Sequence, residues 1–178
     1  MDARTVRRFV VADEGERSRV ISDSPSSNVY ADPARPGFSS ARMWVTDRTP
    51  ARLKGVKELQ WPLHLQPPPG GSLCRVVTFP PDAAFRSTVS ARDVDAFFAE
   101  MGSPEASTSA GGAPHPYMQK TRTLDLCLVL EGEITLILDK QEVHLKAGDT
   151  VVQRGTNHAW SNRSDRPCTI AISTHDAG

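Results

Sequence analysis

The chain has 178 residues, 21 basic and 21 acidic side chains, and a hydrophobic content of 38%, which suits one compact domain. Zero formal net charge gives no long-range field for collecting phosphates, so we expect no nucleic-acid binding. The longest runs of large apolar residues, Leu126–Leu130 and Ile134–Leu138, have five residues each, which is too short to cross a membrane.

The cysteine count and the N-terminal residues indicate the cellular compartment in which the protein is expected. The three cysteines, Cys74, Cys127 and Cys168, form no Cys-x-x-Cys pair, and an odd count argues against a disulfide framework or a zinc site. Met1–Val10 carries three arginines with no apolar run behind them, so no secretory signal is expected. Together these observations predict a soluble protein of the reducing cytoplasm.

The first forty residues predict a hairpin followed by irregular chain. Arg7–Val11 and Arg19–Ser22 are rich in β-branched and apolar residues and flank the polar turn Asp13–Arg17, which is typical of a β-hairpin. Ser22–Ser40 is crowded with Ser, Pro, Asp, Asn and Gly, and this composition indicates irregular chain at the surface.

Short strands and one helix are predicted next. The strand candidates are Arg42–Thr46, Trp61–Leu65 and Leu73–Phe79, each bounded by turn residues. A helix should begin after Ser90, which has capping-box spacing to Asp93, because apolar residues then recur at helical intervals before Gly102: Val94, Phe97, Phe98 and Met101.

A long polar loop follows the predicted helix. Ser103–Pro114 contains small and polar residues that cannot bury a face, so it is either a plain surface insertion or a lid over a site. From Thr121 onward, short strands alternate with tight turns, which indicates an all-β barrel or sandwich. The turns are Glu131-Gly132-Glu133, Asp139-Lys140, Ala147-Gly148-Asp149 and Gly155-Thr156-Asn157.

Three motifs in this region carry a family resemblance. They are Leu128-Val-Leu-Glu-Gly-Glu-Ile-Thr-Leu136, Leu145-Lys-Ala-Gly-Asp-Thr-Val-Val152 and Gly155-Thr-Asn-His-Ala-Trp-Ser-Asn162. In their order and spacing the chain resembles the cupin superfamily. The resemblance implies an all-β double-stranded β-helix, or jelly-roll barrel, with one short helix and an N-terminal β extension.

The resemblance also suggests a division of the chain. Residues 41–175 would form a single cupin barrel, with a helix-plus-loop insertion at about 90–116. Residues 1–40 would form the hairpin and irregular arm, which would pack on the barrel or on a partner subunit. Since cupins usually pair through their sheets, we expect a homodimer.

The metal motif of the family is degenerate in this chain. Metal-binding cupins present two histidines and a carboxylate in the first motif and one histidine in the second. The corresponding positions here are Gln119, Thr121, Asp125 and His158. If a divalent transition metal (Fe, Zn, Mn or Ni) binds, its ligands would be His158, Asp125 and Gln119, and His115 could supply a second imidazole.

Strand periodicity predicts a polar site inside the barrel. His158 and Trp160 share one face of their strand, while Gln119, Thr121 and Asp125 share a face of theirs. We expect His158 and Asp125 to form a catalytic acid–base pair. The expected substrate-binding residues are Gln119, Thr121, Trp160, Tyr117 and His115.

Two arginines are further candidates. Arg75 or Arg154 could bind a carboxylate or enolate oxygen, although arginine is usually a solvated surface residue.

Three functions remain open at this stage. The first is a small-molecule enzyme of lyase or isomerase type that acts next to a carbonyl by decarboxylation, dehydration, cyclisation or isomerisation. The second is a metal-dependent cupin dioxygenase, and the third is a non-catalytic small-molecule-binding cupin. Resemblance to small stand-alone cupins favours the first function, in secondary metabolism, and Trp160 suggests an aromatic or polyketide-like substrate.

Overall fold

The computed structural model describes residues 5–54, 58–109 and 111–177. Residues 1–4 of the predicted arm and residue 110 of the predicted insertion lie outside these ranges. The strands, helix and 3-10 helices of the described part follow in this order: β1 (Arg7–Glu14), β2 (Arg17–Pro25), β3 (Val29–Ala31), β4 (Ser39–Thr46), β5 (Ser72–Phe79), η1 (Asp82–Ala84), α1 (Ala91–Glu100), η2 (Pro104–Ala106), β6 (Thr123–Glu131), β7 (Glu133–Leu138), β8 (Glu142–Lys146), β9 (Thr150–Arg154), β10 (His158–Ser161) and β11 (Cys168–Asp176).

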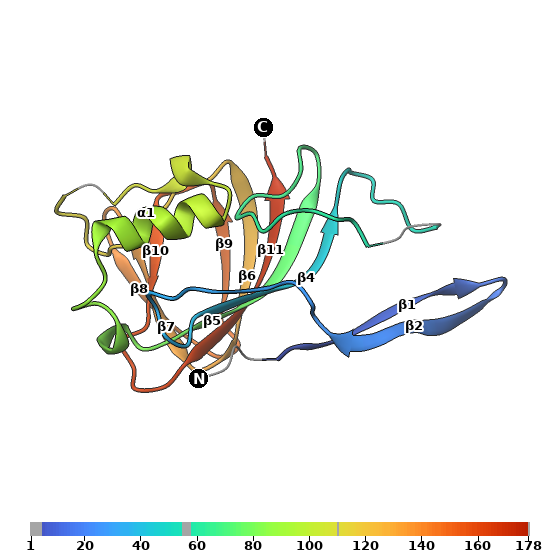
Figure 1. The fold of residues 1–178 in the computed structure, drawn as a ribbon, viewed down its shortest axis with the longest axis horizontal. Helices are drawn as coiled ribbons and strands as arrows, with labels where there is room; N and C mark the ends of the chain where they lie inside the picture. The colour runs from blue at the N-terminus through green and yellow to red at the C-terminus, as the bar shows by residue number, and fades with distance from the viewer. Residues whose placement is uncertain (1–4, 55–57, 110, 178) are drawn as a thin grey trace.

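The strands form two main sheets and a separate hairpin. The larger sheet has six strands in the order β3-β4-β5-β11-β6-β9, and the smaller has three in the order β10-β7-β8. All pairings within them are antiparallel. The predicted hairpin is confirmed as β1 and β2, which extend away from the two sheets (Figure 1). The predicted all-β class is therefore confirmed.

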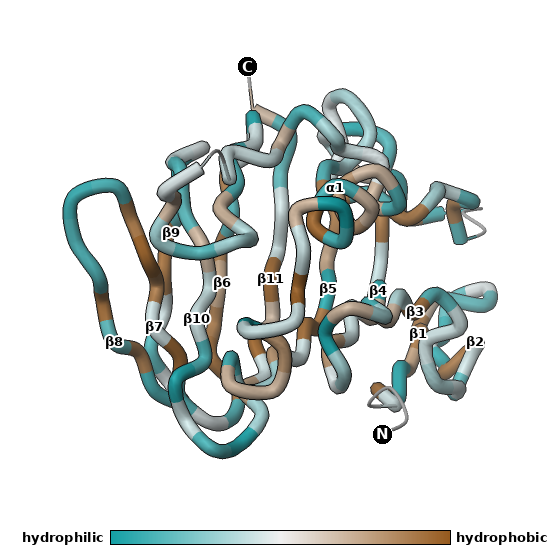
Figure 2. Tube along the Cα trace, turned by 60° about the vertical axis from the view of Figure 1, so that its left-hand side comes forward, coloured by the Kyte–Doolittle hydropathy of each residue, from teal (hydrophilic) through white to brown (hydrophobic). Residues whose placement is uncertain are grey.

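The hydrophobic core lies between the two sheets. Along β6, Thr123, Asp125, Cys127 and Val129 are buried, whereas the intervening leucines are at least partly exposed. This alternation follows from the two-residue repeat of a strand with only one face on the core. Hydrophobic residues gather in the middle of β7 and β11, where those strands face the interior (Figure 2).

Helix α1 closes one opening between the sheets. It begins where predicted, because the Ser90 hydroxyl accepts a hydrogen bond from the Asp93 amide and the Asp93 carboxylate accepts one from the Ser90 amide. Its buried face consists of Val94, Phe97 and Phe98, which pack into the same core as the strands. In Figure 2 the helix lies over β5, and its Phe97 ring contacts the ring of Tyr30 on β3, with a centroid distance of 5.9 Å. No helix of the described residues is long and apolar enough to cross a membrane.

Two local predictions were wrong. Trp61–Leu65 forms no strand, because Pro62 has no N–H to donate to a ladder and the Leu65 amide donates to the Met101 carbonyl at 3.0 Å instead. Ser22–Ser40 is not wholly irregular, since β2 runs to Pro25 and β3 pairs with β4. Tyr30 on β3 is buried, so packing stabilises a strand that the local composition does not indicate.

The polar loop is more buried than its composition predicts. Ser103 and Ala106 are 0% and 1% exposed, and the Lys120 amide donates to the Ala106 carbonyl at 2.8 Å. The first part of Ser103–Pro114 is thereby fixed against the barrel, because small side chains allow close backbone approach.

Candidate functional site

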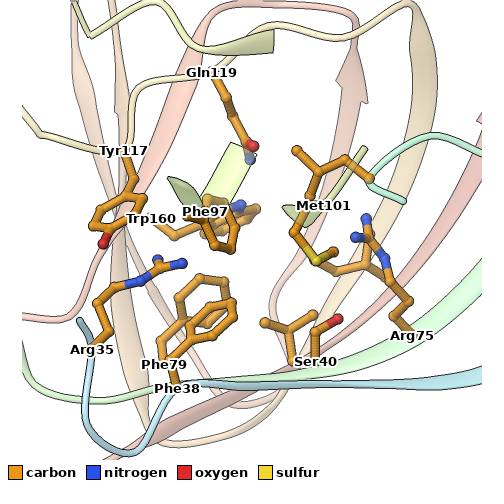
Figure 3. A pocket seen from close by; sticks show the side chains of 13 residues that line it. Arg35, Phe38, Ser40, Arg75, Phe79, Phe97, Met101, Tyr117, Gln119 and Trp160 are labelled. Atoms are coloured by element: carbon orange, nitrogen blue, oxygen red, sulfur yellow. The ribbon is translucent and has the colours of Figure 1, made fainter. Parts of the chain in front are cut away.

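A small cavity lies between the two sheets, under the inner face of α1 (Figure 3). Its volume is about 50 Å³, which corresponds to a few water molecules. Apart from Ser40, the polar side chains of its wall are Arg35, Arg75, Tyr117 and Gln119, and its aromatic wall consists of Phe38, Phe79, Phe97 and Trp160. The cavity combines apolar surface with few convergent polar groups, as small-molecule sites do.

His158, the first residue of β10, is a buried imidazole with a fixed tautomer. Its side chain is 3% exposed, and its Nδ1 lies 3.0 Å from the Thr156 carbonyl oxygen. A carbonyl only accepts hydrogen bonds, so Nδ1 carries the proton and Nε2 has the lone pair. Burial lowers the pKa of His158 below its ordinary 6.5, against the opposing effects of Thr156 and Asp125.

Gln119 connects His158 to the cavity. The Gln119 Nε2 lies 3.3 Å from His158 Nε2, and the amide donates because the neutral imidazole nitrogen accepts. The two backbones also exchange hydrogen bonds, with N–O distances of 2.8 and 2.9 Å. Since Gln119 lines the cavity, the basic nitrogen of His158 lies one side chain away from it.

Asp125 acts on His158 through its charge. Its side chain is buried on the inner face of β6, and its Oδ1 has no hydrogen-bond partner in the described part of the chain. The negative charge of Asp125 raises the pKa of His158. The structure therefore brings the two predicted catalytic residues into electrostatic contact, with Gln119 as the side-chain partner of the imidazole.

Besides Gln119, two of the predicted binding residues lie in the cavity wall, Trp160 and Tyr117. The Trp160 ring centroid is 6.1 Å from that of His158 and 6.2 Å from that of Phe79. The Tyr117 hydroxyl donates to Asp32 at 3.2 Å, and burial raises the pKa of Tyr117 above its ordinary range. Tyr117 therefore contributes a protonated, polar edge to the cavity, and Trp160 contributes a planar surface.

The other two predicted binding residues lie elsewhere. His115 is 1% exposed, with its Nδ1 accepting from the Tyr117 amide at 3.2 Å and its Nε2 located 3.6 Å from Asp82. Thr121 bonds Thr123 at 2.7 Å between hydroxyl oxygens and borders a groove on the outer surface. Neither side chain lines the cavity that Gln119 lines.

Arg35 is a wall residue that sequence reasoning missed. It is 4% exposed, and its Nε donates to Asp32 at 2.6 Å. Its guanidinium lies 3.8 Å from the ring centroid of Phe38, 4.3 Å from that of Phe97 and 3.6 Å from that of Tyr117, distances typical of cation–π contacts. Only its spacing of three residues from Asp32 could have signalled this role.

Arg75, which the sequence left open as either an anion-binding or a surface residue, is buried. It is 8% exposed and lies on the inner face of β5, with Leu73 and Val77 on either side along the strand. Burial lowers the pKa of Arg75, and the charge of Asp125 opposes this effect. Arg154, the other candidate, is exposed at the end of β9, so of these two arginines only Arg75 contributes a charge to the cavity wall.

Comparison with known proteins identifies the domain. Residues 108–174 match the Cupin_2 family, described as a cupin domain. The chain contains a cupin domain. This confirms the expected family and the jelly-roll barrel that the resemblance implied.

This cupin is similar to fungal proteins of biosynthesis clusters. It is 56% identical over 48 residues to phomopsin biosynthesis cluster protein C' of Diaporthe leptostromiformis, covering 26% of this chain and 25% of that protein. It is 28% identical over 156 residues to the cupin-domain-containing oxidoreductase virC of Hypocrea virens, covering 86% of this chain and 59% of that protein. The chain thus spans only part of the length of these relatives.

A solved cupin structure is also among the matches, at low sequence identity. The cupin domain of Schizosaccharomyces pombe Cnp3 is 12% identical, with 97% of this cupin and 87% of that chain covered and a TM-score of 0.45.

The donor set of this cupin does not fit a transition metal. His158 and Asp125 are one imidazole and one carboxylate, Gln119 offers only a neutral amide, and Thr121 bonds to Thr123 instead. Among the described residues, no three His, Cys, Asp or Glu side chains are grouped so that they could hold a metal. Iron, zinc, manganese and nickel sites usually need more imidazole or carboxylate ligands than this.

Proposed function

We propose that this cupin is a small-molecule enzyme of lyase or isomerase type that moves a proton next to a carbonyl group. The reaction would be a decarboxylation, dehydration, cyclisation or isomerisation. The observation that carries the proposal is the neutral, buried imidazole of His158, whose Nε2 lone pair faces the cavity residue Gln119. A base of this kind can act near neutral pH, because burial lowers the pKa of His158 and the imidazole is therefore already unprotonated there.

The proton transfer uses residues whose positions are known. A substrate that enters the cavity would take over the amide of Gln119, whose contact with Nε2 is long at 3.3 Å. The Nε2 atom would then take a proton from the carbon next to the carbonyl, and the C–H electron pair would form an enolate. Gln119 would donate to the enolate oxygen.

The residues around His158 would stabilise the charged intermediate. The Thr156 carbonyl holds the Nδ1 proton, and the nearby charge of Asp125 favours the imidazolium. The imidazolium would return its proton to another carbon or to a leaving group, which completes an isomerisation or a dehydration. Trp160 would pack against a planar substrate.

The relatives support a role in secondary metabolism. Their names place them in the phomopsin and oryzines biosynthesis clusters, and we propose the same general setting for this chain. The name of virC describes an oxidoreductase, which favours a cupin dioxygenase as a second candidate. The poor fit of the donor set to a metal makes the proton-transfer reaction the better-supported function. A non-catalytic binding cupin is the third candidate, and an observed turnover would exclude it.

Hydrogen exchange in heavy water tests the proposed reaction. The protein is incubated with small α-keto and β-keto acids, and NMR follows deuterium entry next to the carbonyl and loss of carbon dioxide. We expect at least one acid to exchange or decarboxylate faster than in buffer. Rates equal to the buffer rate for every acid would contradict the proposal.

We also propose that a second copy of this chain covers the outer face of the large sheet. Leu124, Leu126, Leu128 and Leu130 on β6 are 36–48% exposed, and Val152 on β9 is 63% exposed. The projecting hairpin carries its own exposed apolar residues, with Phe9 and Val11 at 53% and 66%. Each copy thus offers an apolar arm and an apolar face, and exchange of arms would cover both.

Light scattering at micromolar concentration tests this arrangement. We expect a homodimer for the unmodified chain and a monomer for Leu126→Glu, because a carboxylate in the centre of the apolar face would be costly to bury. Leu53→Glu is the control, since Leu53 is 88% exposed and lies outside this face. An unmodified chain that is monomeric would refute the arrangement.

The three cysteines are unpaired thiols. A reducing compartment suits such a protein, and we propose the cytoplasm as its location.

A further inference from the structure

The charged residues of the cavity wall are all cationic. Two buried arginines, Arg35 and Arg75, line the cavity, and none of the other lining residues is acidic. Figure 3 shows the two guanidinium groups on opposite sides, with the aromatic rings between them. A buried cation is stable only when anions or acceptors surround it, so the partners of each arginine show where a ligand is needed.

Arg35 already has its partners. Its Nε donates to the Asp32 carboxylate at 2.6 Å, and three aromatic rings surround its guanidinium. One nitrogen, Nη2, has no hydrogen bond in the described part of the chain, but the ion pair neutralises the charge. Arg35 therefore holds the aromatic wall in place and does not need a further anion.

Arg75 lacks such partners. Its Nε has no hydrogen-bond acceptor among the described residues, and its Nη2 reaches only the Thr174 hydroxyl at a long 3.4 Å. The charge of Asp125 raises the pKa of Arg75. The two side chains form no ion pair in the described part of the chain, since no nitrogen–oxygen distance between them is 4.0 Å or less. The guanidinium consequently has unused donors beside the cavity, although Arg75 as a whole is only 8% exposed.

The shape of the remaining wall limits what these donors can bind. The cavity of about 50 Å³ limits its occupant to a molecule of a few non-hydrogen atoms, and the Trp160 and Phe79 rings offer that molecule a flat apolar surface. The Gln119 amide is a second polar group at this wall. A planar molecule with one anionic end and one carbonyl oxygen matches these features.

We propose that the cavity binds a small planar carboxylic acid whose carboxylate accepts hydrogen bonds from the Arg75 guanidinium. Its carbon frame lies against Trp160 and Phe79, and its carbonyl oxygen accepts from Gln119. A guanidinium suits this task because its Nε and Nη donors form a fork that matches the two carboxylate oxygens. The inference names the substrate class of the proposed reaction and so rests on the proposed function for the role of Gln119.

Calorimetry on the inactive His158→Gln protein tests binding without turnover. The probes are glyoxylate, pyruvate and acetoacetate, each compared with its neutral amide. We expect at least one acid to bind and its amide to bind at least about tenfold more weakly, since tenfold corresponds to about 1.4 kcal/mol. Absence of binding by all three acids, or equal affinity for acid and amide, would overturn the proposal.

Arginine variants in the same His158→Gln background locate the site. Arg75→Met keeps the aliphatic stem and should weaken binding of the acid at least about tenfold, whereas Arg75→Lys should retain part of the affinity. Arg154→Met changes an exposed arginine and should bind like the parent. Unchanged affinity in Arg75→Met would overturn the assignment. If Arg75→Met does not fold, the comparison of acid with amide decides the proposal alone.

Binding and chemistry can fail separately. An acid that binds through Arg75 but shows no exchange in heavy water would leave the carboxylate site standing and refute the proton-transfer function. If deuterium exchange occurs and is unchanged by Arg75→Met, the carboxylate site is refuted and the proton-transfer function stands.

Discussion

Replacing His158 by Gln should lower the turnover of a keto-acid substrate by about 100- to 10,000-fold, the usual contribution of a general base. Gln is close in size to His and its amide can still donate to the Thr156 carbonyl, so the packing against Gln119, which lines the cavity, is preserved. It has no basic nitrogen, however, and cannot take a proton from carbon. We therefore expect a fall in kcat with little change in KM.

His144→Gln is the matched control for this experiment. The His144 side chain is 62% exposed, its Nε2 lies 3.5 Å from Glu133, and it does not line the cavity. The control should keep full activity, and both variants should keep the circular dichroism spectrum of the parent. A His158→Gln protein that retains activity within about threefold of the parent would show that the imidazole is not the base.

Replacing Asp32 by Ala should reduce the free energy of unfolding by about 3–5 kcal/mol, because it leaves a buried cation without its counter-ion. Arg35 and Asp32 have side chains only 5% and 2% exposed and are separated by 2.6 Å. Asp32 also accepts from the Ala34 amide at 2.9 Å and from the Tyr117 hydroxyl. Two side chains of the cavity wall, Arg35 and Tyr117, and the Ala34 amide thus lose a partner together.

Urea denaturation measures this effect, with Asp23→Ala as the control. Asp23 pairs with Arg7 at a similar distance of 2.6 Å, but both side chains are exposed, at 41% and 67%. Exposed ion pairs contribute little because water and salt screen them, so Asp23→Ala should leave the midpoint almost unchanged. Equal midpoints for the two variants would contradict the structural role of the Asp32–Arg35 pair.

Local sequence patterns predicted the elements whose own residues determine them. The alternation along β6 gave the buried face that includes Asp125, and the Ser90 capping box gave the start of α1. Gly132, Gly148 and Gly155 have positive φ values of 80°, 95° and 59°, and all three mark turns that the sequence predicted. Short-range geometry was sufficient in each case.

Long-range contacts explain what the sequence did not predict. Arg35 lies in a stretch rich in Pro and Ser, and only the folded chain brings Phe97 and Tyr117 against its guanidinium. Arg75 reaches the interior because β5 pairs with β11, which also pairs with the strand of Asp125. The contact of His158 with Gln119 likewise depends on an isolated bridge between distant segments. Strand order and register set these contacts, and one sequence does not reveal them.

The charge state of His158 also has a consequence for stability. The unfolded chain keeps the ordinary imidazole pKa of 6.5, whereas burial lowers the pKa in the folded protein. The folded state therefore binds a proton more weakly. The contribution of His158 to stability is complete above pH 6.5 and is lost as the pH falls below it.

Nitrogen NMR of isotope-labelled histidine tests the central claim most directly, because it reads the His158 imidazole without any substrate. The account predicts a neutral ring at pH 7, with the proton on Nδ1 and the lone pair on Nε2, and a pKa below 6.5. Assignment by comparison with His158→Gln identifies the signal among the five histidines. A proton on Nε2 in the neutral ring, or a pKa at or above 6.5, would contradict the account.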